Sequence, residues 1–193
     1  MANYWGVQTV DVSSYTNFRN AIMGNGYDVD YLHGAQCIDL FKLLNYNLGY
    51  PSPYAKTGTN GYVSECWTNA TSRAWNASDK YDLITDITKL KRGDMVIMDG
   101  TTSNPPGHNS FCDADYGTYS GYIPMVGQNQ GGTAFPGGGA VTNVLNWPLD
   151  NFLGAFRLKA WNPTPPTPHG SGGGMRKNKF PWVLYARKLR EQR

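Results

Sequence analysis

The spacing of apolar residues after Cys37 restricts the folds open to this chain more than any other feature. Leu40, Phe41, Leu44 and Leu48 follow Cys37 at helical spacing, which predicts a helix over residues 37–47 with one apolar face. Further elements are predicted as helices near 15–23, capped by Ser14, and near 64–75, and as strands near 94–98, 108–112, 121–126 and 153–159. Helices first and strands afterwards predict an α+β fold, with the N-terminal helices packed on an antiparallel sheet.

Cys37 stands at the start of the predicted helix, where a reactive thiol is expected. The first turn of a helix offers unpaired backbone N–H groups and the positive end of the helix dipole, and both favour thiolate over thiol. A nearby imidazolium would lower the pKa of the thiol further. The alternative is a small buried hydrophobic residue at a helix start. Cys66 and Cys112 are competing nucleophiles, but neither begins a predicted helix.

His108 is the best candidate for the base among three histidines. His169 lies in a stretch rich in Pro and Gly, and His33 lies in a turn four residues before Cys37, where a third group would orient it poorly. His108 follows the loop 101–107 and opens a predicted strand, so a hairpin can present its imidazole toward the cysteine helix. The alternative is a structural histidine at the start of a strand.

The imidazole needs a third group that fixes its tautomer. Asn129 can do this through its side-chain carbonyl, and Asp113 and Asp115 are alternatives in a turn-like segment. Gln36, directly before the cysteine, is a candidate oxyanion donor together with the Cys37 backbone N–H. The chain thus offers a Cys, His and Asn constellation for a thiol hydrolase, and the order of its elements suits a papain-like fold with the cysteine helix on a half-barrel sheet.

These motifs resemble the cysteine, histidine-dependent amidohydrolase/peptidase family, the CHAP domains of phage lysins and bacterial wall hydrolases. The resemblance covers most of residues 12–160 and rests on these segments: Tyr15-Thr16-Asn17-Phe18, Tyr27-Asp28-Val29-Asp30, Gly34-Ala35-Gln36-Cys37-Ile38-Asp39-Leu40, Lys91-Arg92-Gly93-Asp94-Met95-Val96-Ile97, Gly107-His108, Gln128-Asn129 and Gly154-Ala155-Phe156-Arg157. It implies that Cys37 is the nucleophile, His108 the base and Asn129 the imidazole-orienting residue. Gly127 departs from the pattern, because several family members have glutamate two residues before that asparagine. The imidazole would then lack an anionic partner.

A candidate metal loop overlaps the start of the cysteine helix. Its residues match positions 1, 3, 5, 7 and 12 of an EF-hand calcium loop: Asp28, Asp30, the Leu32 carbonyl, the Gly34 carbonyl and Asp39. His33 takes the place of the usual glycine, and Asp39 replaces the bidentate glutamate. Some lysins that resemble this chain bind calcium at corresponding residues, so Ca²⁺ is the expected cofactor. The alternative is a turn whose aspartates cap helices and face water.

Composition limits the remaining classes of protein. The 193 residues, 40% of them hydrophobic, suffice for one globular core of roughly 160 residues. Three cysteines cannot all pair and none has zinc-ligand spacing, so reduced thiols are expected. No apolar stretch approaches the length of about 20 residues that a membrane span needs. Residues 1–5 lack the basic and apolar regions of a signal peptide.

Charge divides the chain unevenly, with −3 over residues 1–174 and +6 over residues 175–193. We therefore expect a catalytic domain over 1–160, a Pro/Gly-rich linker over 161–174 and a basic amphipathic tail over 175–193. The tail is expected to bind an anionic membrane, anionic wall polymers or an acidic partner. Nucleic acid is not expected, because the core is acidic and no binding motif accompanies the tail. The glycine-rich segment before Met175 is also typical of an engineered junction.

The expected function is peptidoglycan hydrolysis by a phage-type lysin, either an endolysin or a virion-associated lysin. Cys37 would attack a wall amide bond, and the partners would be peptidoglycan and, for a virion lysin, virion proteins. The expected location is the host cytoplasm before lysis, or the virion. Two alternatives are a non-catalytic wall-binding or virion structural module of the same fold, and a thiol protease or acyltransferase that acts on protein.

Overall fold

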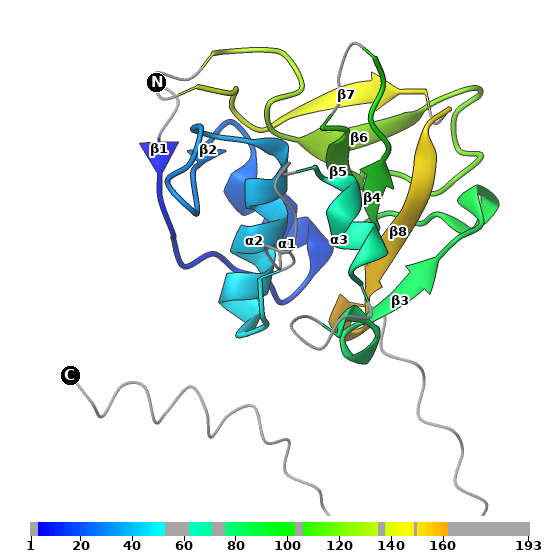
Figure 1. Cartoon of the computed structure of the whole chain (residues 1–193), viewed down its shortest axis with the longest axis horizontal. Coiled ribbons are helices and arrows are strands. Elements are labelled where there is room, and N and C mark those ends of the chain that lie inside the picture. Colours follow the sequence, from blue (N-terminus) through cyan, green and yellow to red (C-terminus); the bar gives the residue numbers. More distant parts are fainter. Residues whose placement is uncertain are drawn as a thin grey trace, which may run out of the picture. The chain divides into compact units, whose positions relative to one another are not determined.

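The structure, a computed structural model, describes residues 4–52, 62–70, 76–102, 106–134, 138–148 and 150–161. Its helices are α1 (Tyr15–Ile22), α2 (Cys37–Leu48) and α3 (Ser64–Thr68), with short 3-10 helices at Ala77–Asp79, Ile87–Lys89 and Lys159–Trp161 (Figure 1). Its strands are β1 (Tyr4–Trp5), β2 (Gly26–Tyr27), β3 (Tyr81–Ile84), β4 (Met95–Met98), β5 (His108–Cys112), β6 (Ile123–Gly127), β7 (Asn143–Trp147) and β8 (Phe152–Leu158). This is the α+β fold that the sequence predicts. The predicted tail and all of the linker after Trp161 lie outside the described residues.

Six strands form one antiparallel sheet in the order β3-β8-β4-β5-β6-β7, while β1 and β2 form a separate parallel pair. Within the sheet, β5 pairs with β4 along most of its length, from Met95 opposite Phe111 to Met98 opposite His108. Its pairing with β6 covers only Phe111 and Cys112 at the far end. The edge of β5 at residues 108–110 is therefore left open toward β6, and this opening receives the start of α2.

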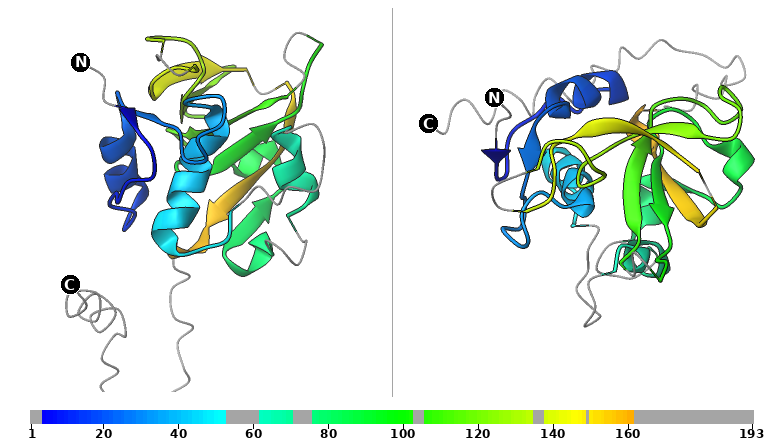
Figure 2. Two further views of the ribbon diagram at one scale, coloured as in Figure 1. Left: turned by 60° about the vertical axis from the view of Figure 1, so that its left-hand side comes forward. Right: turned by 90° about the horizontal axis from the view of Figure 1, so that it is seen from above.

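Apolar side chains join α1 and α2 to one face of the sheet. Both helices lie on the same side of it (Figures 1 and 2). Phe18 of α1 meets Phe111 of β5 edge to face at 5.3 Å, and Phe41 of α2 packs on Phe156 of β8 at 5.5 Å. The helical spacing seen in the sequence thus marks the face of α2 that the sheet covers.

The opposite face of the sheet carries a smaller apolar cluster: Leu90, Val96, Met98, Cys112, Ile123, Met125 and Ala155. Residues of one strand alternate between the two faces, so His108 and Ser110 share a face of β5 with Cys112. Among the described residues, no helix has the length and apolar character that crossing a membrane requires.

Candidate active site

The start of α2 is held in place by its own first turn and by the segment after β6. The Asp39 carboxylate accepts from the Gln36 backbone N–H at 3.0 Å. The buried Gln128 amide donates to the Gln36 carbonyl at 2.7 Å and pairs with both backbone groups of Tyr27 in β2. The Gln128 side chain thus bonds to three backbone groups on two segments, and this fixes the position of Cys37 at the start of α2.

The Cys37 thiol is buried in the opening beside β5. Burial raises its pKa to about 11, although backbone N–H groups of Asn109, Ile38 and Cys37 itself act in the opposite direction. The helix-start N–H groups expected from the sequence are therefore present, but desolvation outweighs them. At neutral pH the resting group is the thiol, in contrast to the thiolate that the sequence predicts.

His108 begins β5 and lies in a closed environment. Its ring stacks on Trp147 of β7 with centroids 4.8 Å apart and planes 12° from parallel. The ring Nε2 lies 2.9 Å from Ser110 Oγ and 3.3 Å from Gln130 Oε1. Burial lowers the pKa of His108 to about 4, so the imidazole is neutral at pH 7 and able to accept a proton.

Cys37 is linked to β5 beside His108 by one backbone contact. The backbone N–H directed at the Cys37 sulfur belongs to Asn109, the neighbour of His108 in the chain. Among the described residues, no hydrogen bond joins the sulfur to the imidazole at rest. A neutral thiol and a neutral imidazole on neighbouring segments are suited to general-base activation, in which the proton transfers as substrate arrives and contacts shorten.

Asn129 does not take the position predicted for it. Its side-chain Nδ2 donates to Gln36 Oε1 at 2.8 Å, and Gln36 Nε2 donates to the His33 carbonyl at 2.6 Å. Within the described residues, the His108 ring makes its hydrogen bonds with Ser110 and Gln130 instead. Asn129 therefore orients the candidate oxyanion donor Gln36, whose amide nitrogen carries a second hydrogen beside the one given to His33.

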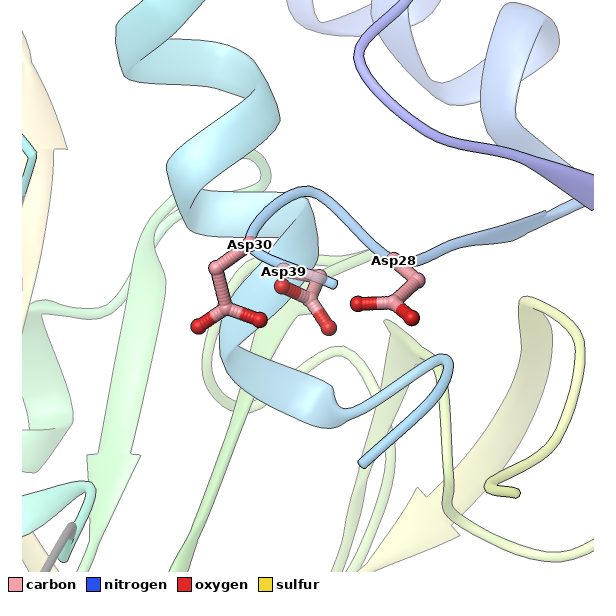
Figure 3. A group of neighbouring side chains, drawn as sticks. All are labelled: Asp28, Asp30 and Asp39. Carbon is pink, nitrogen blue, oxygen red and sulfur yellow. The ribbon is translucent and has the colours of Figure 1, made fainter. Parts of the chain in front are cut away.

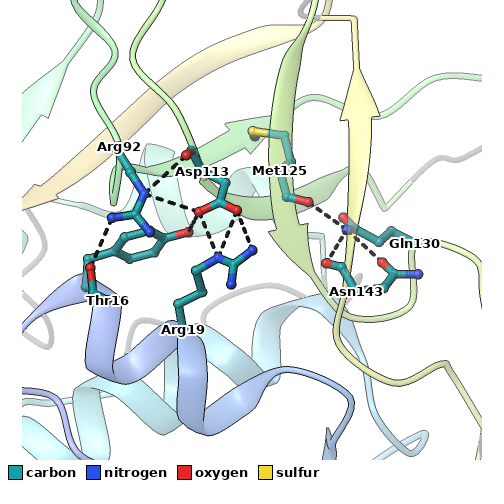
Figure 4. A network of polar contacts seen from close by, with 8 residues as sticks. Thr16, Arg19, Arg92, Asp113, Met125, Gln130 and Asn143 are labelled. Carbon is teal, nitrogen blue, oxygen red and sulfur yellow. Dashed lines mark hydrogen bonds and ion pairs between the residues drawn. The ribbon is translucent and has the colours of Figure 1, made fainter.

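The aspartates considered as alternatives to Asn129 are engaged with arginines. Asp113 accepts from Arg19 at 2.8 Å and from Arg92 at 3.3 Å (Figure 4). Asp115 accepts from the Arg92 backbone N–H at 2.8 Å. These contacts tie α1 to the loops beside β4 and β5, which is a structural role.

The predicted metal loop brings its three carboxylates together. Asp28, Asp30 and Asp39 each offer an oxygen within 4.8 Å of the others, and their side chains gather at the start of α2 (Figure 3). His33, at the position where an EF-hand loop has glycine, adopts the left-handed φ of +66°. Leu32 and Gly34 lie in the same loop, and the role predicted for their carbonyls remains a prediction.

A lysine already supplies positive charge to this cluster. The Lys42 ammonium contacts Asp30 and lies 3.8 Å from Asp39 Oδ1. Burial raises the pKa of Asp39 to about 7, against the opposing effect of Lys42. Hard oxygen donors, a left-handed turn at position 6 and a group that attracts a cation all fit a calcium ion.

The other two thiols are buried in the apolar parts of the fold. Cys66 in α3 and Cys112 at the end of β5 are both buried, and burial raises the pKa of each. Cys112 belongs to the apolar cluster on the second face of the sheet. Cys37 begins α2, whereas Cys66 lies inside α3 and Cys112 ends β5, so Cys37 stays the predicted nucleophile.

Several residues of the site were missed by reasoning from the sequence: Ser110, Gln128, Gln130, Trp147 and Lys42. Two patterns in the sequence could have predicted some of these residues. Ser110 shares a strand face with His108 by the period of two, and Gln130 continues the amide run that includes Asn129. Trp147 has no such signal, because only the pairing of β6 with β7 brings it near.

A surface cavity of about 270 Å³ lies elsewhere on the molecule, lined by Tyr116, Tyr119, Tyr122 and neighbouring residues. It includes none of the predicted site residues. The site is therefore defined by its side chains rather than by this cavity.

Comparison with known proteins finds similarity to phage lysins and agrees with the fold. No protein-family model matches the chain. The chain is 33% identical over 154 residues to a D-alanyl-L-alanine endopeptidase of Streptococcus phage B30, a match that covers 78% of this chain and 31% of that protein. The chain thus spans about a third of the length of the curated relative that it matches.

Two solved structures share the fold. The endolysin LysIME-EF1 gives a TM-score of 0.57 at 22% identity, over 75% of this chain and 64% of that one. Ly7917 gives 0.52 at 15% identity, over 77% of this chain and 62% of that one. The chain is therefore an α+β protein similar to phage lysins in sequence and fold.

Proposed function

We propose that this chain is the catalytic part of a phage lysin that cleaves an amide bond of peptidoglycan with Cys37 as nucleophile. His108 takes the thiol proton while the sulfur attacks the carbonyl carbon, and the oxyanion is stabilised by the Cys37 backbone N–H and the Gln36 amide. The imidazolium then protonates the leaving amine as the C–N bond breaks. Water, deprotonated by His108, hydrolyses the thioester and regenerates the thiol.

The observation that carries this proposal is the placement of Cys37. It begins a helix whose start enters the opening beside β5, and its sulfur faces the residue next to the only buried histidine among the described residues. The similarity to the phage B30 endopeptidase supports the wall peptide as the substrate, and makes a D-alanyl-L-alanine bond the first to test.

The test is mass spectrometry of fragments released from defined peptidoglycans by the full chain and by three single variants. Cys37→Ser should abolish release while leaving a folded protein, because a serine hydroxyl is far less acidic than a thiol and gives up its proton to the base much less readily. Cys66→Ser and Cys112→Ser are matched controls and should retain most activity. Activity in Cys37→Ser together with its loss in either control would reassign the nucleophile. Binding of walls without cleavage by the unaltered chain would favour the non-catalytic wall-binding alternative.

Calcium is the cofactor we propose for the loop of Asp28, Asp30 and Asp39. When bound, it would supply positive charge that locks the loop against the start of α2. Chelation should then lower activity and melting temperature together, and added calcium should restore both. Asp30→Asn should remove the response, whereas Asp82→Asn, at an exposed carboxylate of β3, should keep it. An unchanged melting curve in excess chelator would rule out a bound calcium ion.

The proposed setting follows from the same activity. We place the protein in the host cytoplasm before lysis or on the virion, with peptidoglycan as its partner. The basic segment 175–193, outside the described residues, is proposed to bind anionic membranes or wall polymers through its charge.

A further inference from the structure

The carbonyl oxygen of one buried amide is directed at the ring of His108. Gln130 Oε1 lies 3.3 Å from the ring Nε2, and Ser110 Oγ lies 2.9 Å from the same nitrogen. Ser110 also donates its hydroxyl hydrogen to Gln130 Oε1 at 2.8 Å. Ser110 is 1% exposed, His108 5% and Gln130 7%, so water is excluded from this group of three.

The direction of the Gln130 amide is fixed by its other end. Its Nε2 donates to the Met125 carbonyl at 2.9 Å, to the Asn143 carbonyl at 3.1 Å and to Asn143 Oδ1 at 2.9 Å (Figure 4). Trp147 Nε1 donates to Oε1 at 3.3 Å. A turned amide would set its oxygen against three acceptors and its hydrogens against the indole N–H. The oxygen must therefore face the imidazole.

This arrangement selects one tautomer of His108. The single hydroxyl hydrogen of Ser110 goes to Gln130, so both oxygens near the ring Nε2 present lone pairs to it. A bare Nε2 would face those lone pairs unfavourably, whereas a protonated Nε2 donates to them. The ring hydrogen therefore sits on Nε2, and Nδ1 is left bare to accept the thiol proton.

Gly127 explains why an amide at position 130 can reach the ring. A Cβ at position 127 would overlap Ser110 Oγ and would lie 2.6 Å from Gln130 Oε1. The absence of a side chain there leaves room for both groups. The space from which a glutamate side chain would start is thus filled by a serine hydroxyl and an amide oxygen.

We propose that Gln130, with Ser110, is the positioning residue of His108 and takes the role predicted for Asn129. This inference rests on the proposed hydrolase function, which gives the tautomer its purpose. The partner of the ring is then neutral rather than anionic. The site works as a thiol and imidazole pair that becomes charged during the reaction, and the low pKa of His108 agrees with this.

The test measures the tautomer directly by nitrogen-15 NMR of the histidine rings in the full chain, with His108 assigned by its absence in His108→Ala. The unaltered protein should show His108 as the Nε2–H form. Gln130→Met keeps the size of the side chain but removes the acceptor, so the two tautomers should mix. Its kcat on soluble muropeptides should fall about 10- to 100-fold with KM little changed, since a misplaced base loses efficiency. Asn146→Met, at an exposed amide of β7, is the control and should change neither quantity.

Three results would overturn the proposal. These are a dominant Nδ1–H form in the unaltered protein, an unchanged tautomer in Gln130→Met, or an unchanged kcat in that variant. If Gln130→Met fails to fold, Ser110→Ala decides, because it keeps the Gln130 anchors: tautomer mixing and a lower kcat support the role, and no change in either overturns it. If the unaltered chain cleaves no peptidoglycan, the proposed function fails, while the tautomer still tests the positioning role alone.

Discussion

The two sides of the α2 N-terminus differ in charge, because one holds neutral titratable groups and the other holds charged ones. On one side, Cys37 and His108 are buried among neutral amides and hydroxyls, and burial holds both uncharged at pH 7. On the other, Asp30 and Asp39 lie against the Lys42 ammonium, and Asp28 brings a third carboxylate within 4.8 Å of theirs. The first side carries no charge at rest, whereas the second already holds a cation, the Lys42 ammonium, among its carboxylates. The difference fits the two roles proposed above: chemistry at Cys37 and His108, and fixing of the acidic loop by calcium.

Removal of Lys42, the cation on the charged side, should have the largest effect of the changes proposed. Lys42→Met removes the ammonium from beside the buried Asp39 and the more exposed Asp30, which should cost up to about 3–5 kcal/mol of unfolding free energy in chelator. Calcium at about 100 times its dissociation constant should return roughly 2.7 kcal/mol of this. Lys159→Met is the matched control, since its pairing with Asp82 at 3.7 Å is exposed and should be worth under about 1 kcal/mol. Denaturant unfolding with and without calcium measures both, and equal losses in the two variants would contradict the account.

The neutral side should respond to an added charge through its pH profile. Gln130→Glu puts an anion beside the His108 ring, which favours the imidazolium and raises its pKa from about 4. The base must be neutral to act, so the acid limb of kcat/KM should move to higher pH, with a loss of roughly tenfold per pH unit below the new pKa. The profile on soluble muropeptides measures this. An acid limb that stays where the unaltered chain has it would show that position 130 does not influence the ring.

The sequence predicted the elements that carry strong local signals. Ser14 caps α1 as expected, accepting from the Asn17 N–H at 3.2 Å, and the structure confirms α2 and β5 nearly to the residue. It missed β3 and β7. β7 is mostly exposed and has no buried apolar alternation, and β3 is a four-residue edge strand whose partner, β8, lies about 70 residues away in the chain. Such pairings arise from tertiary contacts, which local patterns do not encode.

The same limit separates what could be predicted of the site from what could not. Cys37, His108 and the acidic loop were predicted from chemistry and spacing along the chain, and the structure brings the three carboxylates of that loop within 4.8 Å of one another. The roles of Asn129 and Gln130 depend on which neighbouring amide points into the opening beside β5. Asn129 has a left-handed φ of +53°, which redirects the chain after β6 and sends successive side chains to different targets. A Gln-Asn-Gln run does not specify such a turn, so the sequence assigned the contact with the His108 ring to Asn129, whereas Gln130 makes it in the structure.

The charged side should also bind calcium in a pH-dependent way. Asp39 has its pKa raised to about 7 in the folded protein, above its usual value near 3.8. Without metal, its contribution to stability is therefore greatest below about pH 4 and is lost as pH rises toward 7. Calcium requires the carboxylate, so protons compete with it below pH 7. The rise in melting temperature on adding calcium should be larger at pH 8 than at pH 6. Asp39→Asn should flatten this difference, and an equal rise at both values in the unaltered chain would contradict the raised pKa.

Removal of the basic tail, whose charge we expect to be exposed, should have the smallest effect. The tail adds a third electrostatic environment to the comparison. Residues 175–193 carry +6, separate in sequence from the −3 of the preceding residues. Deleting residues 171–193 should leave kcat on soluble muropeptides nearly unchanged, because none of the proposed site residues lies there. Binding to anionic vesicles or whole walls should weaken, and in the unaltered chain it should fall as salt rises, since exposed charges are screened beyond about 8 Å at physiological ionic strength. Pull-downs at two salt concentrations, beside melting curves and light scattering of both proteins, measure this. A lower melting temperature or a changed oligomeric state after deletion, with salt-independent binding before it, would instead assign the tail to packing or assembly.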